Sequence, residues 1–197
     1  MVYRLIGLAR SIVACVVAVT ALALAPGAGA QGVGVDIYQR APLAEAAMRG
    51  DVARLRGLLL NGQSPNGVDL EGRPAILLAA WGNHVEVVEA LVEAKARVDQ
   101  RDRIGSTAMI AAADRGFVRI VELLIEGKGN VNLENRQGMT PLIVAAQKGH
   151  APIVELLIKA GAKLDQQDLG GRTALEWAQL NNRRQVVDLL KRAGAKS

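Results

Sequence analysis

Cysteine, histidine and aromatic residues are scarce in this chain. Its 197 residues include one cysteine, two histidines, and aromatic residues at 3% of the total. The cysteine, Cys15, lies in a leading segment that we expect to be removed, so the mature chain would have no disulfide, no thiolate metal ligand and no cysteine nucleophile. The fold must then be held together by packing alone, which a hydrophobic content of 50% allows.

The first thirty residues have the pattern of an export signal. Arg4 and Arg10 precede an uncharged apolar run over residues 12–25, and small residues ending at Ala30 supply a cleavage point. A run this short suits a signal peptide, whose apolar part needs about 7 to 15 residues, better than a membrane span, which needs roughly 20. We therefore predict a signal peptide at residues 1–30, cleaved after Ala30, and a periplasmic location. An inner-membrane anchor is the alternative if the segment is retained.

Lipidation at Cys15 is a third possibility. Residues 12–15 resemble the bacterial lipobox, the motif that places a lipid-modified cysteine at the cleavage point. Arg10 interrupts the apolar run before this cysteine, and the residues after it remain apolar where a mature lipoprotein should turn polar. These features favour cleavage after Ala30, with a membrane-anchored or lipidated envelope scaffold as the alternative.

A unit of 33 residues recurs through the rest of the chain. The apolar segment IVELLI at residues 153–158 occurs identically at 120–125 and more loosely at 87–92. A period of 20–50 residues indicates stacked repeats, so this self-similarity decides the architecture. Other columns with the same period are Thr107, Thr140 and Thr173; Gly72, Gly105, Gly138 and Gly171; and the alanine pairs that begin at Ala46, Ala79, Ala112 and Ala145.

Each copy contains the signals of a turn and two short helices. An Asp or Asn followed three residues later by Gly, as at Asn135 and Gly138, predicts a tight turn, because Asx side chains bond nearby backbone and Gly accepts a positive φ. Thr140 then predicts a helix N-cap, Pro141 fits the first helical position, and Gly149 predicts a left-handed end to that helix. A second apolar helix follows and ends at another glycine. Helices of about nine residues are marginal alone, so the units must stack into a solenoid.

The pattern D-x-x-G-x-T-P-L, A-A, G-H, V-V-x-L-L and G-A-x-V-N/D resembles the ankyrin repeat, whose length is also 33 residues. The resemblance covers residues 37–197 and implies an all-α ankyrin-repeat solenoid of helix-turn-helix units with short β-turn loops. A short linker at residues 31–36 would join it to the signal segment, which makes the chain a bacterial, exported ankyrin-repeat protein. We place the repeats at residues 36–68, 69–101, 102–134, 135–167 and 168–197.

Departures from the ankyrin pattern change what is expected locally. The family commonly has His after Thr-Pro-Leu, whereas here apolar packing is expected to replace the threonine–histidine hydrogen bond. Pro74 stands where Thr is expected, so the first helix of the second repeat should lack a hydroxyl cap. The first and last repeats are expected to be caps, and the last is polar over residues 181–185. The residues in the usual histidine position are Leu77, Ile110, Ile143 and Glu176.

Catalysis is not expected from this composition. His84 and His150 lie two whole repeats apart, so a stacked array should hold them well separated and they cannot form a two-histidine metal site. Their column holds an acid, an aromatic and a base in the other repeats, which favours a structural place at the start of the second helix. We expect no cofactor and no metal, and an enzyme with an unrecognised site is the alternative. The other members of the column are Asp51, Phe117 and Arg183.

A binding surface is therefore the expected site of function. The ankyrin resemblance implies contacts from the turn tips and the exposed end of the first helix, positions that carry eight basic and two acidic residues here. This balance favours a protein partner with an acidic surface; alternatively, the arginines only keep exposed turns soluble. Aromatic residues are too few to stack bases, so we expect no nucleic acid, no membrane span after processing, and a monomer. The candidate partner-binding residues are Arg40, Arg49, Arg73, Trp81, Arg103, Ile104, Arg115, Arg136, Met139, Lys148 and Arg172.

Trp81 is the strongest single candidate. Its column is normally exposed and holds polar residues in the neighbouring repeats, whereas Trp177 is expected to pack inside. An exposed tryptophan beside Arg73 and Arg115 has the composition of a binding hot spot, which is enriched in Trp, Tyr and Arg. The alternative is partial burial of the ring under the neighbouring turn.

Overall fold

The computed structural model describes residues 41–196, and the expectations for the leading segment, the linker and Arg40 lie outside this range. The described part is helical, as predicted: ten helices follow one another in pairs, and a single β-bridge joins Val68 to Pro74. Between residues 41 and 196, none of the helices is long and apolar enough to span a membrane. The helices are α2 (Pro42–Arg49), α3 (Val52–Leu60), α4 (Ala75–Trp81), α5 (Val85–Glu93), α6 (Ala108–Arg115), α7 (Val118–Glu126), α8 (Pro141–Lys148), α9 (Ala151–Lys159), α10 (Ala174–Leu180) and α11 (Arg184–Arg192).

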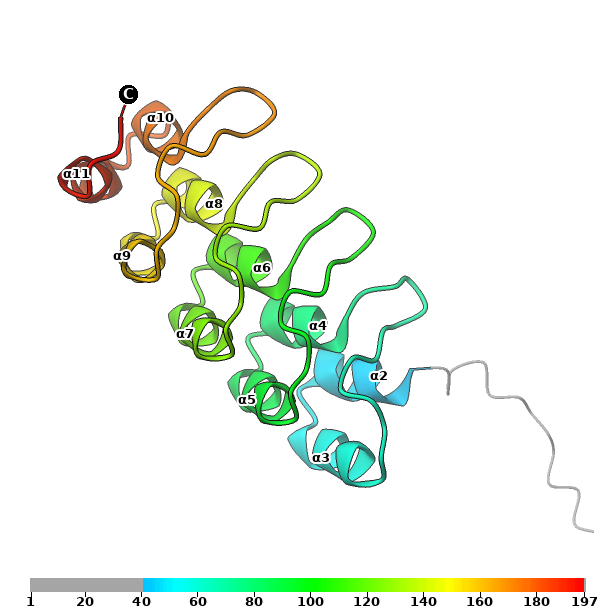
Figure 1. The fold of residues 1–197 in the computed structure, drawn as a ribbon. Coiled ribbons are helices and arrows are strands. Elements are labelled where there is room, and N and C mark those ends of the chain that lie inside the picture. The colour runs from blue at the N-terminus through cyan, green and yellow to red at the C-terminus, as the bar shows by residue number, and fades with distance from the viewer. Residues whose placement is uncertain (1–40, 197) are drawn as a thin grey trace, which may run out of the picture. The chain divides into compact units, whose positions relative to one another are not determined.

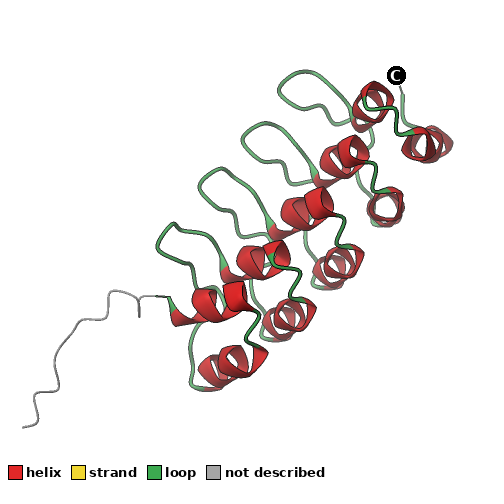
Figure 2. Cartoon of the chain, turned by 180° about the vertical axis from the view of Figure 1, so that it is seen from behind, coloured by secondary structure: helices red, strands yellow, loops and turns green. Residues whose placement is uncertain are grey.

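The helix pairs stack into a solenoid with two layers (Figure 1). The first helices of the pairs, α2, α4, α6, α8 and α10, pack side by side in one layer, and the second helices, α3, α5, α7, α9 and α11, form the other. The loops that connect successive pairs project together to one side, away from both layers (Figure 2). This arrangement places all turn tips in one row beside the first helices.

The turns are built by Asp or Asn side chains, as predicted. In the third repeat the Oδ1 atom of Asp102 accepts the backbone N–H groups of Ile104 at 3.0 Å and Ser106 at 2.7 Å. Gly105 completes the turn with φ of +77°, a conformation that glycine adopts without the steric cost of a Cβ. The other turns make the same two bonds through Asp69, Asn135 and Asp168.

Threonine side chains cap the first helices, as predicted. The Oγ1 atom of Thr140 accepts the backbone N–H of Ile143 at 3.2 Å, and Pro141 occupies the first turn of α8. Pro74, at the same place before α4, offers no side-chain cap. Thr173 belongs to a complete capping box, because Oε2 of Glu176 accepts its backbone N–H at 2.7 Å. The sequence analysis did not predict this capping box, because it identified Glu176 only as the residue that replaces the usual histidine.

Small and branched apolar side chains fill the space between helices. The alanine pairs, such as Ala112 and Ala113, are fully buried and let neighbouring first helices approach closely. Ile143, which replaces the usual histidine, is 1% exposed, so apolar packing does fill that position. Leu124 and its equivalents from the second helices complete one continuous core. Because neighbouring repeats share this core, each pair is stabilised by burying apolar surface against the next.

A column of Asn and Asp residues joins consecutive repeats, which the sequence analysis did not anticipate. The Oδ1 atom of Asn132 accepts the backbone N–H of Lys163 in the next repeat at 2.8 Å. These bonds lie after the second helices and provide acceptors for backbone N–H groups that make no backbone hydrogen bond within residues 41–196. The same bond is made by Asn66, Asp99 and Asp165 to the backbone N–H groups of Arg97, Asn130 and Lys196.

Candidate functional site

The candidate partner-binding residues within the described range lie along the row of turn tips and at the ends of the first helices. Ile104 is 62% exposed at a turn tip, so its side chain is available for contact. Met139, by contrast, is half-buried and packs against the core, and its backbone N–H bonds to Asn135. The structure therefore divides the predicted set into side chains that face outward and side chains already used within the fold.

Three of the predicted basic residues are engaged in ion pairs. These pairs leave the three residues with little uncompensated positive charge, because each faces at least one carboxylate of its own or a neighbouring repeat. The pairs are Arg49 with Glu45 at 2.8 Å, Arg73 with Asp69 at 2.6 Å and Glu71 at 3.2 Å, and Lys148 with Asp114 at 3.2 Å.

Arg73 in particular acts as a brace of its own turn. Its Nε donates to Oδ2 of Asp69, and its backbone N–H donates to Oδ1 of the same residue. Partial burial raises the pKa of the Asp69 carboxyl, but the N–H donors of Arg73 and the backbone N–H of Glu71 stabilise the charged form more strongly, so the pKa lies below its ordinary value. Replacing Arg73 would therefore disturb the turn as well as any contact with a partner.

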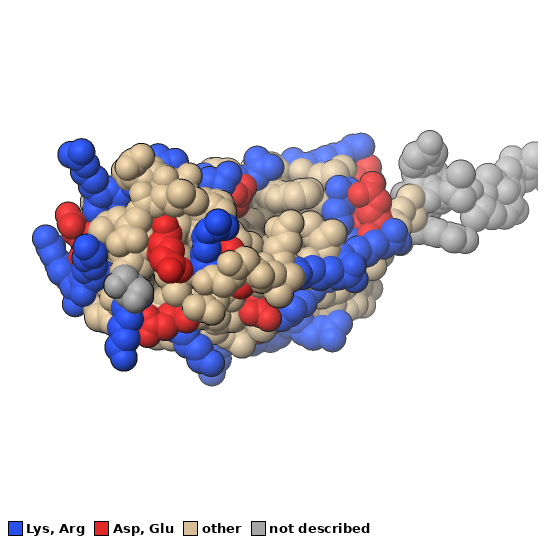
Figure 3. Space-filling model, turned by 90° about the horizontal axis from the view of Figure 1, so that it is seen from above, with Lys and Arg blue, Asp and Glu red and all other residues tan. Residues whose placement is uncertain are grey.

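Four predicted arginines make no ion pair within residues 41–196: Arg103, Arg115, Arg136 and Arg172. Arg103 and Arg136 occupy equivalent turn tips in the third and fourth repeats, and both are exposed. The view from above shows Lys and Arg side chains distributed along the molecule with Asp and Glu side chains between them (Figure 3). Within the predicted set, the basic side chains without an ion pair are therefore these four arginines of the tips and helix ends.

Trp81 lies close to two of the predicted arginines, the ion-paired Arg73 and the unpaired Arg115. Its side chain is 40% exposed at the end of α4, and the guanidinium carbons of Arg73 and Arg115 lie 6.0 Å and 5.8 Å from its ring centroid. At about 6 Å a guanidinium is attracted to the face of an indole ring. The predicted neighbourhood of Trp81 is therefore present, and the ring remains partly accessible.

Trp177 has a different environment at the far end of the array. Its ring is half-buried against the core, its Nε1–H donates to Oδ2 of Asp168 at 2.7 Å, and Arg172 lies 5.2 Å from its centroid. Partial burial raises the pKa of the Asp168 carboxyl. The backbone N–H of Arg172, the indole N–H of Trp177 and the backbone N–H of Gly170 together lower this pKa by more than burial raises it, so the pKa lies below its ordinary value. Arg172 is thus held over Trp177.

Two exposed apolar side chains that are not in the candidate set border a pocket in the first two repeats. Met48 at the end of α2 is 49% exposed, and Leu70 at the next turn tip is 66% exposed. Both line a pocket of about 320 Å³, whose other lining residues include Ala44 and the buried Leu78. Met48 and Leu70 belong to different repeats, and only the packing of α2 against the following turn brings them together around the pocket.

The two histidines bond to the preceding repeat. His84 Nε2 lies 3.1 Å from the carbonyl oxygen of Met48, and His150 Nε2 lies 3.1 Å from that of Asp114. Arg183, in the same column, donates through Nε to the carbonyl of Gln147 at 3.2 Å. Each carbonyl lies near the end of a first helix, so the column supplies donors to otherwise unpaired helix-end acceptors.

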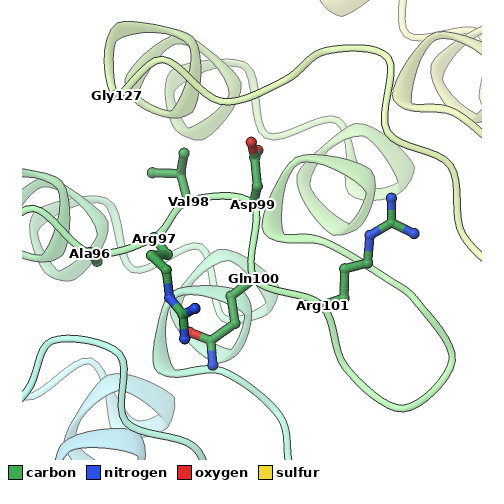
Figure 4. A pocket seen from close by; sticks show the side chains of 7 residues that line it. All are labelled: Ala96, Arg97, Val98, Asp99, Gln100, Arg101 and Gly127. Atoms are coloured by element: carbon green, nitrogen blue, oxygen red, sulfur yellow. The ribbon is translucent and has the colours of Figure 1, made fainter.

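A second pocket lies on the loop between α5 and α6 (Figure 4). It measures about 560 Å³, and Arg97 and Gln100 point to the side of the loop opposite Asp99. Asp99 accepts the backbone N–H of Asn130, and Arg101 donates to the carbonyl of Glu134, so these side chains serve the stacking of repeats. No three His, Cys, Asp or Glu side chains between residues 41 and 196 are placed to hold a metal ion.

Comparison with known proteins agrees with the repeat architecture. The family model described as "Ankyrin repeats (3 copies)" matches residues 43–135 and 108–197. A curated relative, ankyrin repeat protein nuc-2 of Neurospora crassa, is 41% identical over 59 residues, which are 30% of this chain and 6% of that protein. The chain therefore matches a small part of the length of this relative.

Proposed function

Because the chain belongs to the ankyrin-repeat family, whose repeats generally mediate protein–protein interactions, we propose that it is a non-catalytic adaptor or scaffold of the bacterial envelope. It binds a protein partner with an acidic surface through the turn tips and the exposed ends of the first helices. Protein binding is inferred from the family, and the acidic character of the partner is inferred from the surface residues of this chain.

The environment of Trp81 carries this proposal. A half-exposed indole ring with Arg115 beside it offers a large rigid contact surface next to a positive charge, the combination that dominates measured interface energies. Arg103 and Arg136 add exposed guanidinium groups without carboxylate partners in residues 41–196. Guanidinium groups bind carboxylates through paired hydrogen bonds, so an acidic protein surface matches this row.

Capture of partners from a bacterial envelope fraction tests the proposal. The double variant Arg103→Glu with Arg136→Glu should lose the captured protein, and capture by the wild type should weaken as salt increases. The control is Arg97→Glu with Lys163→Glu, which makes the same change of charge on loops that follow second helices. Equal capture of the same protein by the tip variant and the control would show that the partner binds elsewhere.

The proposed location depends on processing of residues 1–30. The pattern of two arginines, a short apolar run and small residues up to Ala30 supports export with cleavage after Ala30. Mass spectrometry of the exported protein should find Gln31 as the first residue. An intact N-terminus would instead indicate a membrane-anchored scaffold, and a lipid-modified Cys15 as the first residue would indicate a lipoprotein.

A further inference from the structure

We propose that the partner presents an extended segment with two parts: a bulky apolar side chain that enters the pocket of the first two repeats, and acidic residues that lie over the third and fourth repeats. This inference rests on the proposed function and specifies the chemistry of the partner. It follows from the apolar pocket of the first two repeats and from the arginines without ion pairs at the tips and helix ends of the third and fourth repeats.

The apolar part of the surface is the pocket beside α2. Met48 and Leu70 border it and the buried Leu78 forms part of its wall, within a volume of about 320 Å³. This lies at the low end of the range of about 300–1,000 Å³ for ligand pockets, so it suits one large side chain. The pocket is also lined by five charged residues, three acidic and two basic, all of them in ion pairs: Glu45 with Arg49, and Asp69 and Glu71 with Arg73.

The positively charged part begins in the next repeat. Arg115, at the end of α6, and Arg103, at the preceding turn tip, make no ion pair among the described residues. Arg136 repeats the tip position in the fourth repeat, also without such a partner. Carboxylates placed here would gain charge-assisted hydrogen bonds, whereas carboxylates at the pocket would meet charges that are already satisfied.

Trp81 lies between the two parts. It ends α4, which packs against α2 on one side and α6 on the other, and Arg73 and Arg115 both lie within about 6 Å of its ring. An extended segment running from the pocket toward Arg115 would therefore pass over the exposed part of this ring. Contact with the indole would desolvate the guanidinium of Arg115 and strengthen its interaction with an acidic side chain.

The spacing of the stack sets the spacing within the segment. Packed helices lie about 8–10 Å apart and an extended chain advances about 3.3 Å per residue, so each repeat corresponds to about three residues of the segment. Arg103 and Arg115 lie one to two repeats beyond the pocket, and Arg136 lies one repeat further. The acidic residues should therefore begin about three to six residues from the apolar side chain.

Fluorescein-labelled synthetic peptides test this inference by fluorescence anisotropy with the full chain. The probe has one phenylalanine separated by about five glycine and serine residues from a short run of glutamates, in both chain directions. Comparison peptides replace the phenylalanine with glutamine, or the glutamates with glutamine or lysine. Binding should require both parts, and the chain direction that binds more tightly gives the orientation of the segment.

Matched protein variants locate the two parts. Leu70→Glu and the pair Arg103→Glu with Arg136→Glu should each weaken binding of the two-part peptide by about tenfold or more. Leu169→Glu, at the equivalent turn tip of the fifth repeat, and Arg97→Glu with Lys163→Glu should change it by less than about twofold. All these side chains are exposed, so the helical circular dichroism signal should be unchanged.

Any of four results would overturn the inference. Equal binding of the peptide that lacks phenylalanine would remove the pocket from the site, and binding unaffected by Leu70→Glu would do the same. Failure of every peptide to bind would exclude an extended two-part segment; partner capture that still depends on Arg103 and Arg136 would then leave the proposed function intact. Self-association of the protein that is abolished by Leu70→Glu would identify a second copy as the occupant.

Discussion

Two lysines occupy positions where the repeat requires a left-handed residue, and their replacement should stabilise the protein. Lys95 and Lys128 follow the second helices with φ of 60° and 62°, at the place that Gly161 holds in the fourth repeat. Each donates its backbone N–H to close the helix end, as Gly161 does, at 3.0 Å and 2.9 Å. Both side chains are exposed. The lysine side chains therefore add strain without a packing contact to the core.

The size of the effect follows from two opposing terms. A left-handed conformation costs a residue with a Cβ roughly 1–2 kcal/mol, and glycine avoids this cost. Glycine loses more conformational freedom on folding, which offsets about 0.4–1 kcal/mol of the gain. A Cβ at Gly161 would meet no atom within 4 Å, so this column involves the backbone term alone. The net stabilisation should be about 0.5–1 kcal/mol at each site.

Urea unfolding followed by circular dichroism measures this difference. Lys95→Gly and Lys128→Gly should each raise the urea midpoint with an unchanged slope, and the double variant should raise the melting temperature by about 2–8 °C. The control is Lys95→Ala, which removes the charge but keeps the Cβ and the strained φ. It should lie within about 0.5 kcal/mol of wild type.

The comparison between glycine and alanine decides the matter. If Lys95→Ala were as stabilising as Lys95→Gly, removal of charge rather than relief of backbone strain would be the cause. If Lys95→Gly were destabilising, the lysine side chain would be making a contact that the repeat geometry does not show, and the assignment of this column to a purely conformational role would be wrong.

Two further predictions concern the turns and the joints between repeats. Asn132→Ala should lower the free energy of unfolding, measured in urea, by about 1–2 kcal/mol, because the backbone N–H of Lys163 loses its acceptor. Asn132→Asp should be nearly neutral in the same measurement, because Asp99 makes the same bond one repeat earlier. The pKa of Asp168 is lowered in the folded protein. At a pH above the ordinary aspartate pKa of about 3.9, the charged carboxylate therefore stabilises the fold, and this stability is lost as the pH falls through the lowered pKa. Asp168→Asn, which copies Asn135 in the preceding turn, should therefore show a smaller loss of stability between about pH 5 and pH 2. An identical loss in variant and wild type would contradict the lowering of the Asp168 pKa by folding.

Sequence alone predicted the features that depend on a few neighbouring residues. Thr140 caps its helix and Asn135 builds its turn because each bonds to backbone within four residues. Gly149 ends α8 in a left-handed conformation, which glycine signals locally in the sequence, although the close approach of Arg183 to Gly149 is visible only in the structure. The 33-residue period then places these local units in a stack, so the sequence is enough to predict the helical solenoid.

Features that depend on the next repeat were not predicted in the same way. Asn132 bonds to a backbone group 31 residues away, and His150 to a carbonyl 36 residues away, so neither role is visible within one unit. The ion pairs of Arg73, a predicted contact residue, depend on side-chain conformation and are not visible in the sequence pattern. Trp81 was placed correctly beside Arg115, since the stacking of equivalent helix ends sets that neighbourhood.

The affinity of the Trp81→Ala variant for a captured protein partner tests the central claim most directly. Isothermal titration should show a loss of about 2 kcal/mol or more, which is about a thirtyfold increase in Kd, with an unchanged helical signal. Leu180→Ala removes an exposed apolar side chain from the same column in the fifth repeat and should leave the Kd unchanged. An unaltered Kd for Trp81→Ala, or a loss of helical structure in that variant, would contradict the claim that Trp81 lies at the centre of a protein-binding surface.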